Sequence, residues 1–500
     1  MRRAIAAAAL LATSCTSMEP KYVRPDPAVP ASWPVGDAYL KASEVGLPAL
    51  TYKQVFTDPR LQTLIAEALN NNRNLMTAAA NVAAAREQYR IQRTQQFPTV
   101  DANAGATVSG NRGGGGSSSG SSGGRGSGSN IAAQFQAGVS VPSYEVDLFG
   151  RLRSLTDVQL NRYFSTEAGA RATRLTLVSN IASAWLNHAA DSSLLLIDEQ
   201  TAASAQKSVR LTRLRLEGGI APRTDLDRAE QILDSTEADL ARQRTAVAQD
   251  INALRLLVGG PVDPSLLAHS IDEAFGTVAP MPTGLDSYVL LRRPDVVQAE
   301  YELRAANANI GAARATLFPR ISLTGLLGFA SSALLKLFTG GAFGWSAGAN
   351  ASYTIFQAGA GHANVRLSEA QKRAAISTYQ GTVQTAFREV SDALARRGTM
   401  NDEIAARQRQ QAETADTYLL TEDRYDAGID PFLNVLDAQR SYYAAQQTLV
   451  NTKLTAAQNI VDTYQAIGGD ALLEGTPICQ RLPGDIGEPN LVLRQECLPD

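Results

Sequence analysis

One stretch of the sequence, Arg424 to Asp437, gathers the residues that offer chemistry, and it reads RYDAGIDPFLNVLD. Gly428 suits the left-handed position just past a helix end, and Pro431 suits the first turn of a new helix. Leu433 and Asp437 stand four residues apart, so they share one face of that second helix. An arginine and a phenol near a carboxylate can hold two helical hairpins together. From the residues alone, the favoured interpretation of Asp437, and of Asp225 at the earlier tip, is an ordinary solvated charge. The alternative is a ring of acidic side chains, which selects cations or holds a constriction in a channel.

No other set of residues suggests catalysis or metal binding. The three histidines, His188, His269 and His362, lie far apart in different expected elements, so we expect surface or packing roles for them. The five methionines do not cluster, and no methionine ladder for copper or silver is visible. The Gly/Ser-rich run from Asn111 to Asn130 lacks the lysine and following helix of a phosphate-binding loop. We therefore expect no enzyme, no metal and no cofactor.

The composition favours long helices. Charged residues make up 19% and the formal net charge is −3, so no basic excess points to nucleic acid. Aromatic residues make up only 6%, while Ala, Gln, Arg and Leu recur in long runs, which is typical of coiled coils. No run of about 18 apolar residues is present, so any crossing of a membrane is expected to use strands.

The sequence repeats itself at long range. Residues 219–222, GIAP, answer residues 428–431, GIDP, and 209 residues separate the two tips. The glycine pairs at 259–260 and 468–469 are separated by the same distance. A chain that makes one helical hairpin tip twice is a repeat protein, so we expect two similar halves.

Each half predicts helix, strand, strand, long helix, tip and return helix. In the first half we expect helices from Asp58 and over 74–96, strands near 100–109 and 133–141, a long helix over 150–217 and a return helix over 223–258. In the second half we expect a helix over 294–317, strands from 321 and over 343–355, a loop over 329–342, a long helix over 361–427 and a return helix to 467. Apolar residues at steps of three and four predict buried seams along the two long helices. They are Leu175, Val178, Ala182, Trp185 and Ala189 in the first, and Ile376, Tyr379, Val383, Ala386, Val390 and Ala393 in the second.

Four strands per chain impose an assembly. Each strand is about long enough to cross a membrane when tilted, but four strands cannot close a barrel without an open edge in lipid. Two chains would give eight strands and an interior filled by side chains, whereas three would give twelve and room for a channel. The fold is therefore expected to be mixed α and β, with strands and long helices pooled between chains.

The two ends of the sequence carry processing signals. Arg2 and Arg3 precede an apolar run and then Thr13-Ser14-Cys15, which predicts a signal peptide over 1–14 and a lipidated Cys15. The alternative is a plain signal peptide with an incidental cysteine. Cys479 and Cys497 form an even pair, which predicts a disulfide in an exported protein or, as the alternative, two free thiols.

Several features together resemble one family, the TolC-like outer-membrane efflux channels, and within it the lipoprotein subfamily that serves resistance-nodulation-division (RND) pumps. They are the lipoprotein-like start, the duplicated halves, YEVDLFGRLR at 144–153, the Phe-Pro helix ends, and the tip at 425–440. The resemblance covers roughly residues 50–470. It implies a trimer with a 12-stranded outer-membrane barrel continued by a helical periplasmic barrel.

The resemblance also implies boundaries and roles. The ends and the middle are a lipidated tether over 15–56, a connector over 261–284 and a tail over 470–500. Each half then has periplasmic helices (57–98 and 285–318) and a barrel hairpin (99–148 and 319–356). Each half also has a long helical hairpin (149–260 and 357–469), with its tip at 218–222 or 427–431.

At the second tip, Leu433 matches an apolar ring and Asp437 an acidic ring of the closed periplasmic gate. Arg424 and Tyr425 match residues that brace the inner hairpin, and Asp225 matches their acidic partner. Asn434 departs from channels that carry a second acidic ring there, which puts cation affinity at the gate in doubt.

Gly218, Gly219 and Gly428 are expected as turn residues that also let an adaptor hairpin dock. The predicted function is a passive exit duct of a tripartite pump in the outer membrane, with outer-membrane lipid, a periplasmic adaptor and an inner-membrane RND transporter as partners. The alternatives are a conduit for type I protein secretion and a structural coiled-coil lipoprotein.

Overall fold

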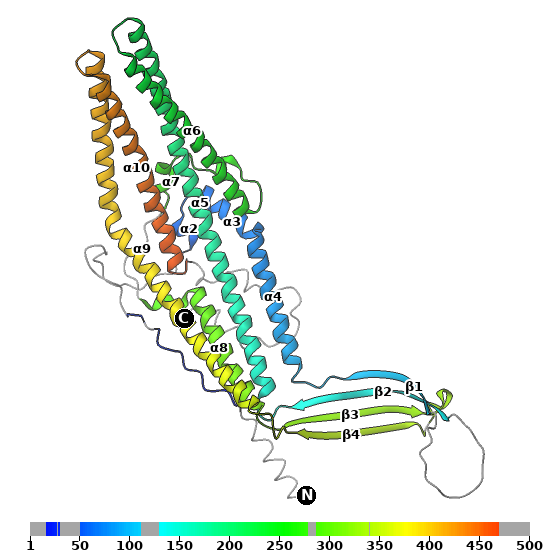
Figure 1. Cartoon of the computed structure of the whole chain (residues 1–500). Helices are drawn as coiled ribbons and strands as arrows, with labels where there is room; N and C mark the ends of the chain where they lie inside the picture. Colours follow the sequence, from blue (N-terminus) through cyan, green and yellow to red (C-terminus); the bar gives the residue numbers. More distant parts are fainter. Residues whose placement is uncertain are drawn as a thin grey trace, which may run out of the picture. The chain divides into compact units, whose positions relative to one another are not determined.

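The computed structural model describes residues 17–27, 29–30, 51–111, 130–278, 287–339 and 341–469. The expected sites at Cys15, Cys479 and Cys497 lie outside these residues. The chain divides into two compact units (Figure 1). One, the sheet unit, holds residues 84–163 and 301–376 with the segment up to Arg24, and the other, the helical unit, holds residues 25–83, 164–300 and 377–500.

The sheet unit contains one antiparallel sheet of four strands in the order β1-β2-β3-β4. The strands are β1 (Asp101–Asn111), β2 (Asn130–Val146), β3 (Arg320–Ser331) and β4 (Phe343–Ser352). The two predicted hairpins, one from each half, join through β2 and β3, and β1 and β4 are the edges. The predicted strands and their antiparallel hairpins are thereby confirmed.

The register sorts apolar and polar side chains into separate rows across the sheet. Ala102, Val139, Leu327 and Trp345 stand opposite one another in one row, whereas Asn103, Gly138, Gly328 and Gly344 form the next. Residues paired across neighbouring strands share a face, so one face is apolar and the other small and polar. The backbones approach closely where Gly138 meets Gly328, since an added Cβ at Gly138 would lie 2.7 Å from the Leu327 carbonyl oxygen.

Several strand ends differ from the prediction, and β2 runs over Asn130–Val146 rather than near 133–141. β4 ends at Ser352 rather than at Ile355, because its last partner is Arg320, the first residue of β3. Pro319 precedes that partner and has no N–H to extend the ladder. β3 continues to Ser331, so the loop expected over 329–342 begins later and contains a short 3₁₀ helix, η3 (Leu334–Lys336).

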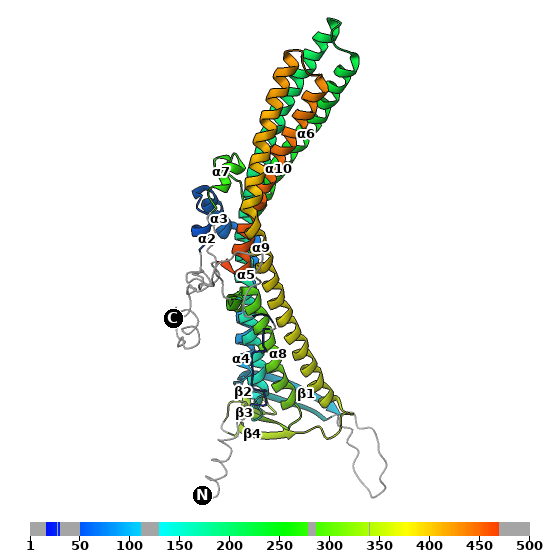
Figure 2. The ribbon, with the colours of Figure 1, turned by 90° about the vertical axis from the view of Figure 1, so that its left-hand side faces the viewer.

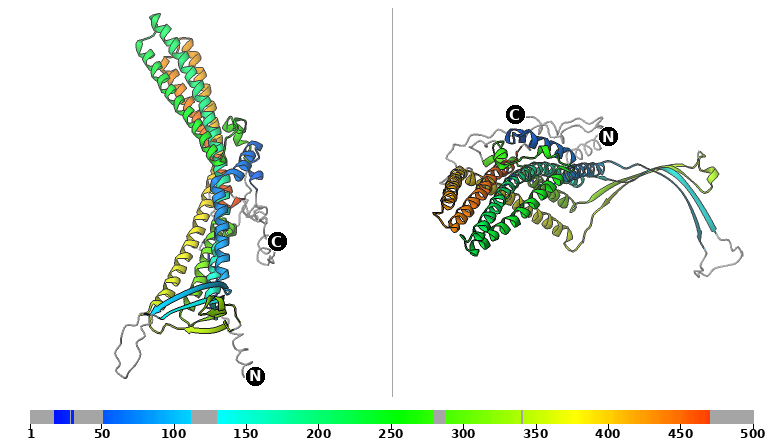
Figure 3. Two further views of the ribbon diagram at one scale, coloured as in Figure 1. Left: turned by 90° about the vertical axis from the view of Figure 1, so that its right-hand side faces the viewer. Right: turned by 90° about the horizontal axis from the view of Figure 1, so that it is seen from above.

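Two long hairpins make up most of the helical unit, and the first helix of each begins within the residues of the sheet unit. The first hairpin is α5 (Arg151–Glu217) with α6 (Arg223–Val258), and the second hairpin is α9 (Ala360–Asp426) with α10 (Phe432–Ala466). Their tip ends lie side by side (Figure 2 and Figure 3). The predicted seams are confirmed, since Trp185 and Tyr379 and their seam neighbours are buried and only Ile376 is half-exposed. Among the described residues, no helix is long and apolar enough to span a membrane.

Shorter elements surround the bases of the hairpins. They are α2 (Tyr52–Val55), α3 (Pro59–Asn71), η1 (Pro264–Leu266), α7 (Ile271–Phe275) and η2 (Ser287–Arg292), while α4 (Arg73–Thr94) and α8 (Pro294–Ala315) precede the strands in each half. Asp58, expected to begin a helix, caps α3 by accepting a hydrogen bond from the Arg60 N–H. Ser270 caps α7 within the expected connector, which shows why this segment forms a helix.

Candidate functional site

The two hairpin tips share one backbone design. Gly219 and Gly428 have φ of +72° and +74°, as the sequence predicted for Gly428. The N–H of Ile220 donates to the carbonyl of Arg215 at 2.8 Å, and that of Ile429 donates to Arg424 at 2.9 Å. Bonds of this kind satisfy the last carbonyls of a helix and fix the exit angle of the chain. Each tip is therefore a rigid turn that holds its side chains in defined positions.

The second return helix, α10, begins one residue later than predicted, whereas α6 begins at Arg223 as predicted. Pro431 has extended dihedral angles, φ −73° and ψ 151°, and is the N-cap of α10 rather than part of its first turn. Pro222 has the same role before α6. Of the glycines expected as docking residues, Gly218 follows the end of α5 with a negative φ, while a Cβ on Gly219 or Gly428 would meet no atom within 4 Å.

Arg424 forms its ion pair within its own tip. Its Nε lies 2.7 Å from Asp430 Oδ2, and its Nη2 lies 3.1 Å from Asp430 Oδ1. These bonds lower the pKa of Asp430 below its ordinary value. The expected partner, Asp225, lies in the first turn of α6, and its carboxylate has no ion pair within the described part of the chain. Within one chain the acidic partner of Arg424 is thus Asp430, which the Gly428 turn brings back toward it.

Tyr425 is the buried centre of the tip. Only 8% of it is exposed, and it packs with Phe432 at 5.3 Å between ring centroids. The Arg215 guanidinium, from the first hairpin, lies 4.1 Å from the centroid of the Tyr425 ring. Arg215 Nη2 also lies 3.7 Å from Asp426 Oδ1. A guanidinium over an aromatic face is attractive, so Arg215 joins the first tip to the second.

Sequence reasoning missed Arg215, although a signal was present. Arg215 stands 209 residues before Arg424, at the matching position of the repeat. The residue matching Asp430 is Ala221, which offers no carboxylate. Arg215 therefore has no acidic partner within its own tip, and it reaches Tyr425 and Asp426 instead.

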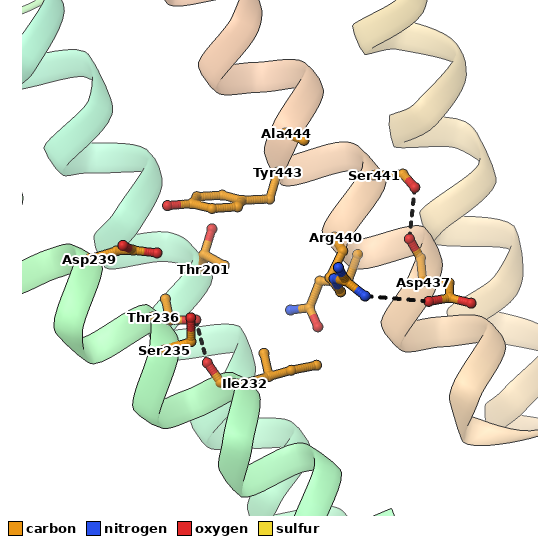
Figure 4. A pocket seen from close by; sticks show the side chains of 11 residues that line it. Thr201, Ile232, Ser235, Thr236, Asp239, Asp437, Arg440, Ser441, Tyr443 and Ala444 are labelled. Atoms are coloured by element: carbon orange, nitrogen blue, oxygen red, sulfur yellow. Dashed lines mark hydrogen bonds and ion pairs between the residues drawn. The ribbon is translucent and has the colours of Figure 1, made fainter.

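Leu433 and Asp437 are both exposed on α10. The exposed fraction of Leu433 is 45%, and that of the Asp437 side chain is 67%. Arg440 Nη1 lies 3.9 Å from Asp437 Oδ1, which is a loose pair on one helix. Asp437 borders a cavity of about 730 Å³ between α5, α6 and α10 (Figure 4). The other charged residues at this cavity are Asp239 and Arg440.

Two residues that line this cavity, Tyr443 and Gln439, also connect the hairpins through hydrogen bonds. Tyr443 Oη donates to Asp198 Oδ1 at 2.6 Å, which joins α10 to α5. Burial raises the pKa of Asp198, and burial together with Asp198 raises the pKa of Tyr443. A second link runs from Gln439 Nε2 to Ser204 Oγ at 3.1 Å. The sequence does not predict these contacts, because polar residues on a long helix are normally expected on its exposed face.

Nothing in the described residues assembles a metal or catalytic site. No group of three His, Cys, Asp or Glu side chains among them is placed to hold a metal ion. His188 is buried with Nδ1 unpaired, and burial lowers its pKa. The arrangement of charged and aromatic residues at the tips suits a mechanical contact between hairpins.

Comparisons with known proteins agree with this architecture. The family described as "Outer membrane efflux protein" matches residues 64–260 and 286–469. The solvent efflux pump outer membrane protein SrpC of Pseudomonas putida is 39% identical over 470 residues, which cover 92% of this chain and 97% of the relative. OprJ of Pseudomonas aeruginosa is 36% identical, with 92% and 94% covered.

Solved structures give the same result. The open state of the MtrE outer membrane channel of Neisseria gonorrhoeae superposes with a TM-score of 0.80 at 33% identity, covering 91% of this chain and 99% of that one. A membrane protein from Pseudomonas aeruginosa gives a TM-score of 0.81 at 34% identity, covering 91% and 100%. The predicted fold class and outer-membrane location with a periplasmic extension are confirmed. The chain belongs to the outer membrane efflux protein family, and it is an outer-membrane efflux channel rather than an enzyme.

Proposed function

We propose that three copies of this chain form the exit duct of a tripartite efflux pump, through which small apolar or amphiphilic molecules leave passively. The observation that carries the proposal is the four-stranded sheet, which has an apolar face and two unpaired edges, β1 and β4. Unpaired strand edges cannot be exposed to lipid, and three such sheets joined edge to edge would give a closed barrel of twelve strands.

The side-chain rows support this use of the sheet. Val108, Val139, Leu327 and Trp345 are exposed in one chain, at 65%, 45%, 53% and 72% respectively. A large exposed apolar surface of this kind requires a covering, and the acyl chains of the outer membrane supply one. The opposite row of Asn and Gly would then line the bore, where small polar side chains leave room for cargo.

The substrate class is proposed from the relatives. The names of the related proteins refer to solvent, toluene and antibiotic efflux. Small molecules of that kind are the cargo we propose here, delivered by an inner-membrane RND transporter through a periplasmic adaptor. We propose that the adaptor docks at the tips, where Gly219 and Gly428 leave open surface and Ile220 and Ile429 are 81% and 63% exposed. Cys15 is proposed as a lipid anchor in the same membrane, and Cys479 with Cys497 as a disulfide.

The proposed gate is the second tip with the face of α10 that follows it. Leu433 and Asp437 would form its apolar and acidic rings, since both side chains are exposed. Tyr425 would hold the tip in place through Arg215, while Arg424 would stiffen the turn through Asp430. Asp225 has no ion pair among the described residues of one chain, and we propose that it serves contacts between chains in the trimer.

Single-channel recording in planar bilayers tests the duct and its acidic ring. Wild-type protein is expected to show cation-selective openings, and Asp437→Ala is expected to reduce that selectivity because it removes three carboxylates from the trimer's bore. Asp402→Ala, which removes an exposed carboxylate of the other helix of this hairpin, α9, is the matched control and should leave selectivity unchanged. Absence of channels from folded wild-type protein would contradict the duct. Unchanged selectivity in Asp437→Ala would show that residues other than Asp437 form the acidic ring.

A further inference from the structure

Two carboxyl groups face each other between the arms of the first hairpin. Asp191 lies on α5 and Asp250 on α6, and their side chains are within hydrogen-bonding reach of each other. Asp250 Oδ2 is buried and accepts no hydrogen bond among the described residues. About two turns before Asp250 on α6, Gln243 Nε2 donates to the Asp191 backbone carbonyl at 3.1 Å, so the two helices are in contact here. The pair therefore lies inside a packed interface between helices.

Among the described residues, no cation contributes to the raised pKa of Asp250. On α5, His188 lies one turn before Asp191, and burial lowers its pKa, so it is neutral at neutral pH. Its ring hydrogen-bonds the backbone of Ala268, and the neighbouring His269 also acts on it. The only charge that acts strongly on Asp250 is that of Asp191. Two carboxyl groups within hydrogen-bonding reach of each other do not both ionise freely, because the negative charge of one disfavours ionisation of the other.

The second hairpin lacks the pair. The residues 209 positions later are Met400 and Asn459, which are 7% and 3% exposed. Asn459 Nδ2 donates to the Ala393 carbonyl at 3.1 Å, so that side chain is satisfied without any proton exchange. The same level of the repeat thus carries a titratable contact in one hairpin and a neutral one in the other.

We propose that Asp191 and Asp250 form a proton-dependent fastening between α5 and α6. With one proton bound, the carboxyl O–H of one aspartate donates to the carboxylate of the other and holds the arms together. When that proton leaves to solvent, two negative charges face each other in a half-buried site and the arms separate locally. The fastening acts on the first hairpin alone, and it does not depend on the proposed gate at the tips.

The direction of the pH effect follows from linkage. Burial and the neighbouring Asp191 raise the pKa of Asp250 to about 7, above the ordinary value of an aspartate. The folded state therefore binds a proton that the unfolded state has already lost at mildly acidic pH. The stability from this contact is fully present below pH about 4 and is lost as the pH rises through about 7. Local opening of the first hairpin is thus expected above neutral pH.

Hydrogen exchange of the full-length trimer, followed by mass spectrometry at pH 6 and pH 8, tests the fastening. After correction for intrinsic rates, amides near residues 188–194 and 247–253 should exchange about tenfold faster at pH 8, because the deprotonated fraction rises about tenfold across a pKa near 7. The matching segment 397–403, which carries Met400 in place of Asp191, serves as the internal control and should show no such change.

Conservative variants make the test specific. In Asp250→Asn and in Asp191→Asn, an amide donates to the remaining carboxylate at every pH, so the pH effect should vanish while protection stays high. Asp234→Asn, at an exposed position of α6, should behave as wild type. Equal pH responses in both hairpins, or a pH effect that persists in both variants, would overturn the proposal. Infrared spectroscopy of wild type at pH 6 should also show a protonated carboxyl band that either variant removes.

Discussion

The two helical hairpins have the same backbone and differ in what they carry. α5 and α9 are each 67 residues long, and each ends in a glycine with positive φ followed by a proline cap. At the second tip Arg424 is paired with Asp430. At the first tip the residue that corresponds to Asp430 is Ala221, which offers Arg215 no carboxylate. The two tips therefore share a backbone design. Arg215 of the first tip contacts the other tip, whereas Arg424 of the second tip pairs within its own.

The stems differ in the same way. The first hairpin has Asp191 against Asp250 where the second has Met400 and Asn459. One contact can respond to pH and the other cannot. The two hairpins therefore share the design of their tips, and polar residues at matching positions make different contacts.

The largest effect is expected from Tyr425→Ala, which removes the buried ring that joins the two hairpins. Loss of a large buried aromatic side chain costs about 3 kcal/mol of stability, and the second tip should also loosen. Thermal unfolding and single-channel conductance measure the two consequences. Tyr425→Phe should remain close to wild type, because the ring beneath Arg215 is retained. Leu420→Ala, at a position that is 56% exposed, is the control and should change neither quantity much.

An exchange of stem residues should remove the pH response of the first hairpin. The variant with Asp191→Met and Asp250→Asn carries the side chains of the second hairpin. Its unfolding midpoint should vary less between pH 5 and 8 than that of wild type, whose stability falls as Asp250 loses its proton. A pH profile that the exchange leaves unaltered would show that the pair contributes nothing to stability.

A smaller effect is expected from Ala221→Asp, which gives the first tip the carboxylate of the second. Arg215 should then be held within its own tip, as Arg424 is by Asp430. The contact over Tyr425 is worth about 1 kcal/mol, and its loss should raise the open probability of the channel. Ala221→Asn, which adds a similar volume without the charge, is the matched control. If both variants open the channel equally, size rather than charge disturbs the tip.

The smallest effect on stability is expected from Arg440→Ala, which removes a loose pair to an exposed Asp437. Exposed pairs of this kind contribute about 0.5 kcal/mol or less. Thermal unfolding should therefore be nearly unchanged, while cation selectivity in bilayers should increase as Asp437 loses its cationic neighbour. A clear loss of stability would indicate that Arg440 packs more tightly than its 74% exposed side chain suggests.

Much of the fold was predictable because it follows from periodicity. Steps of three and four placed Trp185 and Tyr379 in buried seams, and alternation placed the strands. The end of β4 was missed because it depends on Pro319 of the partner strand, which alternation within β4 does not reveal. Short helices such as α7 were missed because five residues are too few to show helical periodicity. The Ser270 cap stabilises the first turn of α7 instead.

Less of the site was predictable. The sequence and the family resemblance pointed to Arg424 and Tyr425, but not to their partners. Arg215 contacts Tyr425 across more than 200 positions of sequence, a pairing that only the packed hairpins reveal. The Asp198–Tyr443 and Asp191–Asp250 contacts have the same origin, since each joins two helices whose relative register the sequence pattern does not state.

One measurement tests the proposed gate most directly, by asking whether the contact of Arg215 with Tyr425 or the pair of Arg424 with Asp430 keeps it shut. Single-channel conductance would be recorded for wild type, Arg215→Ala and Arg424→Ala, each as a purified trimer in planar bilayers. We predict small, brief openings for wild type and Arg424→Ala, and larger, longer openings for Arg215→Ala. Equal opening in both variants, or opening in Arg424→Ala alone, would contradict this prediction.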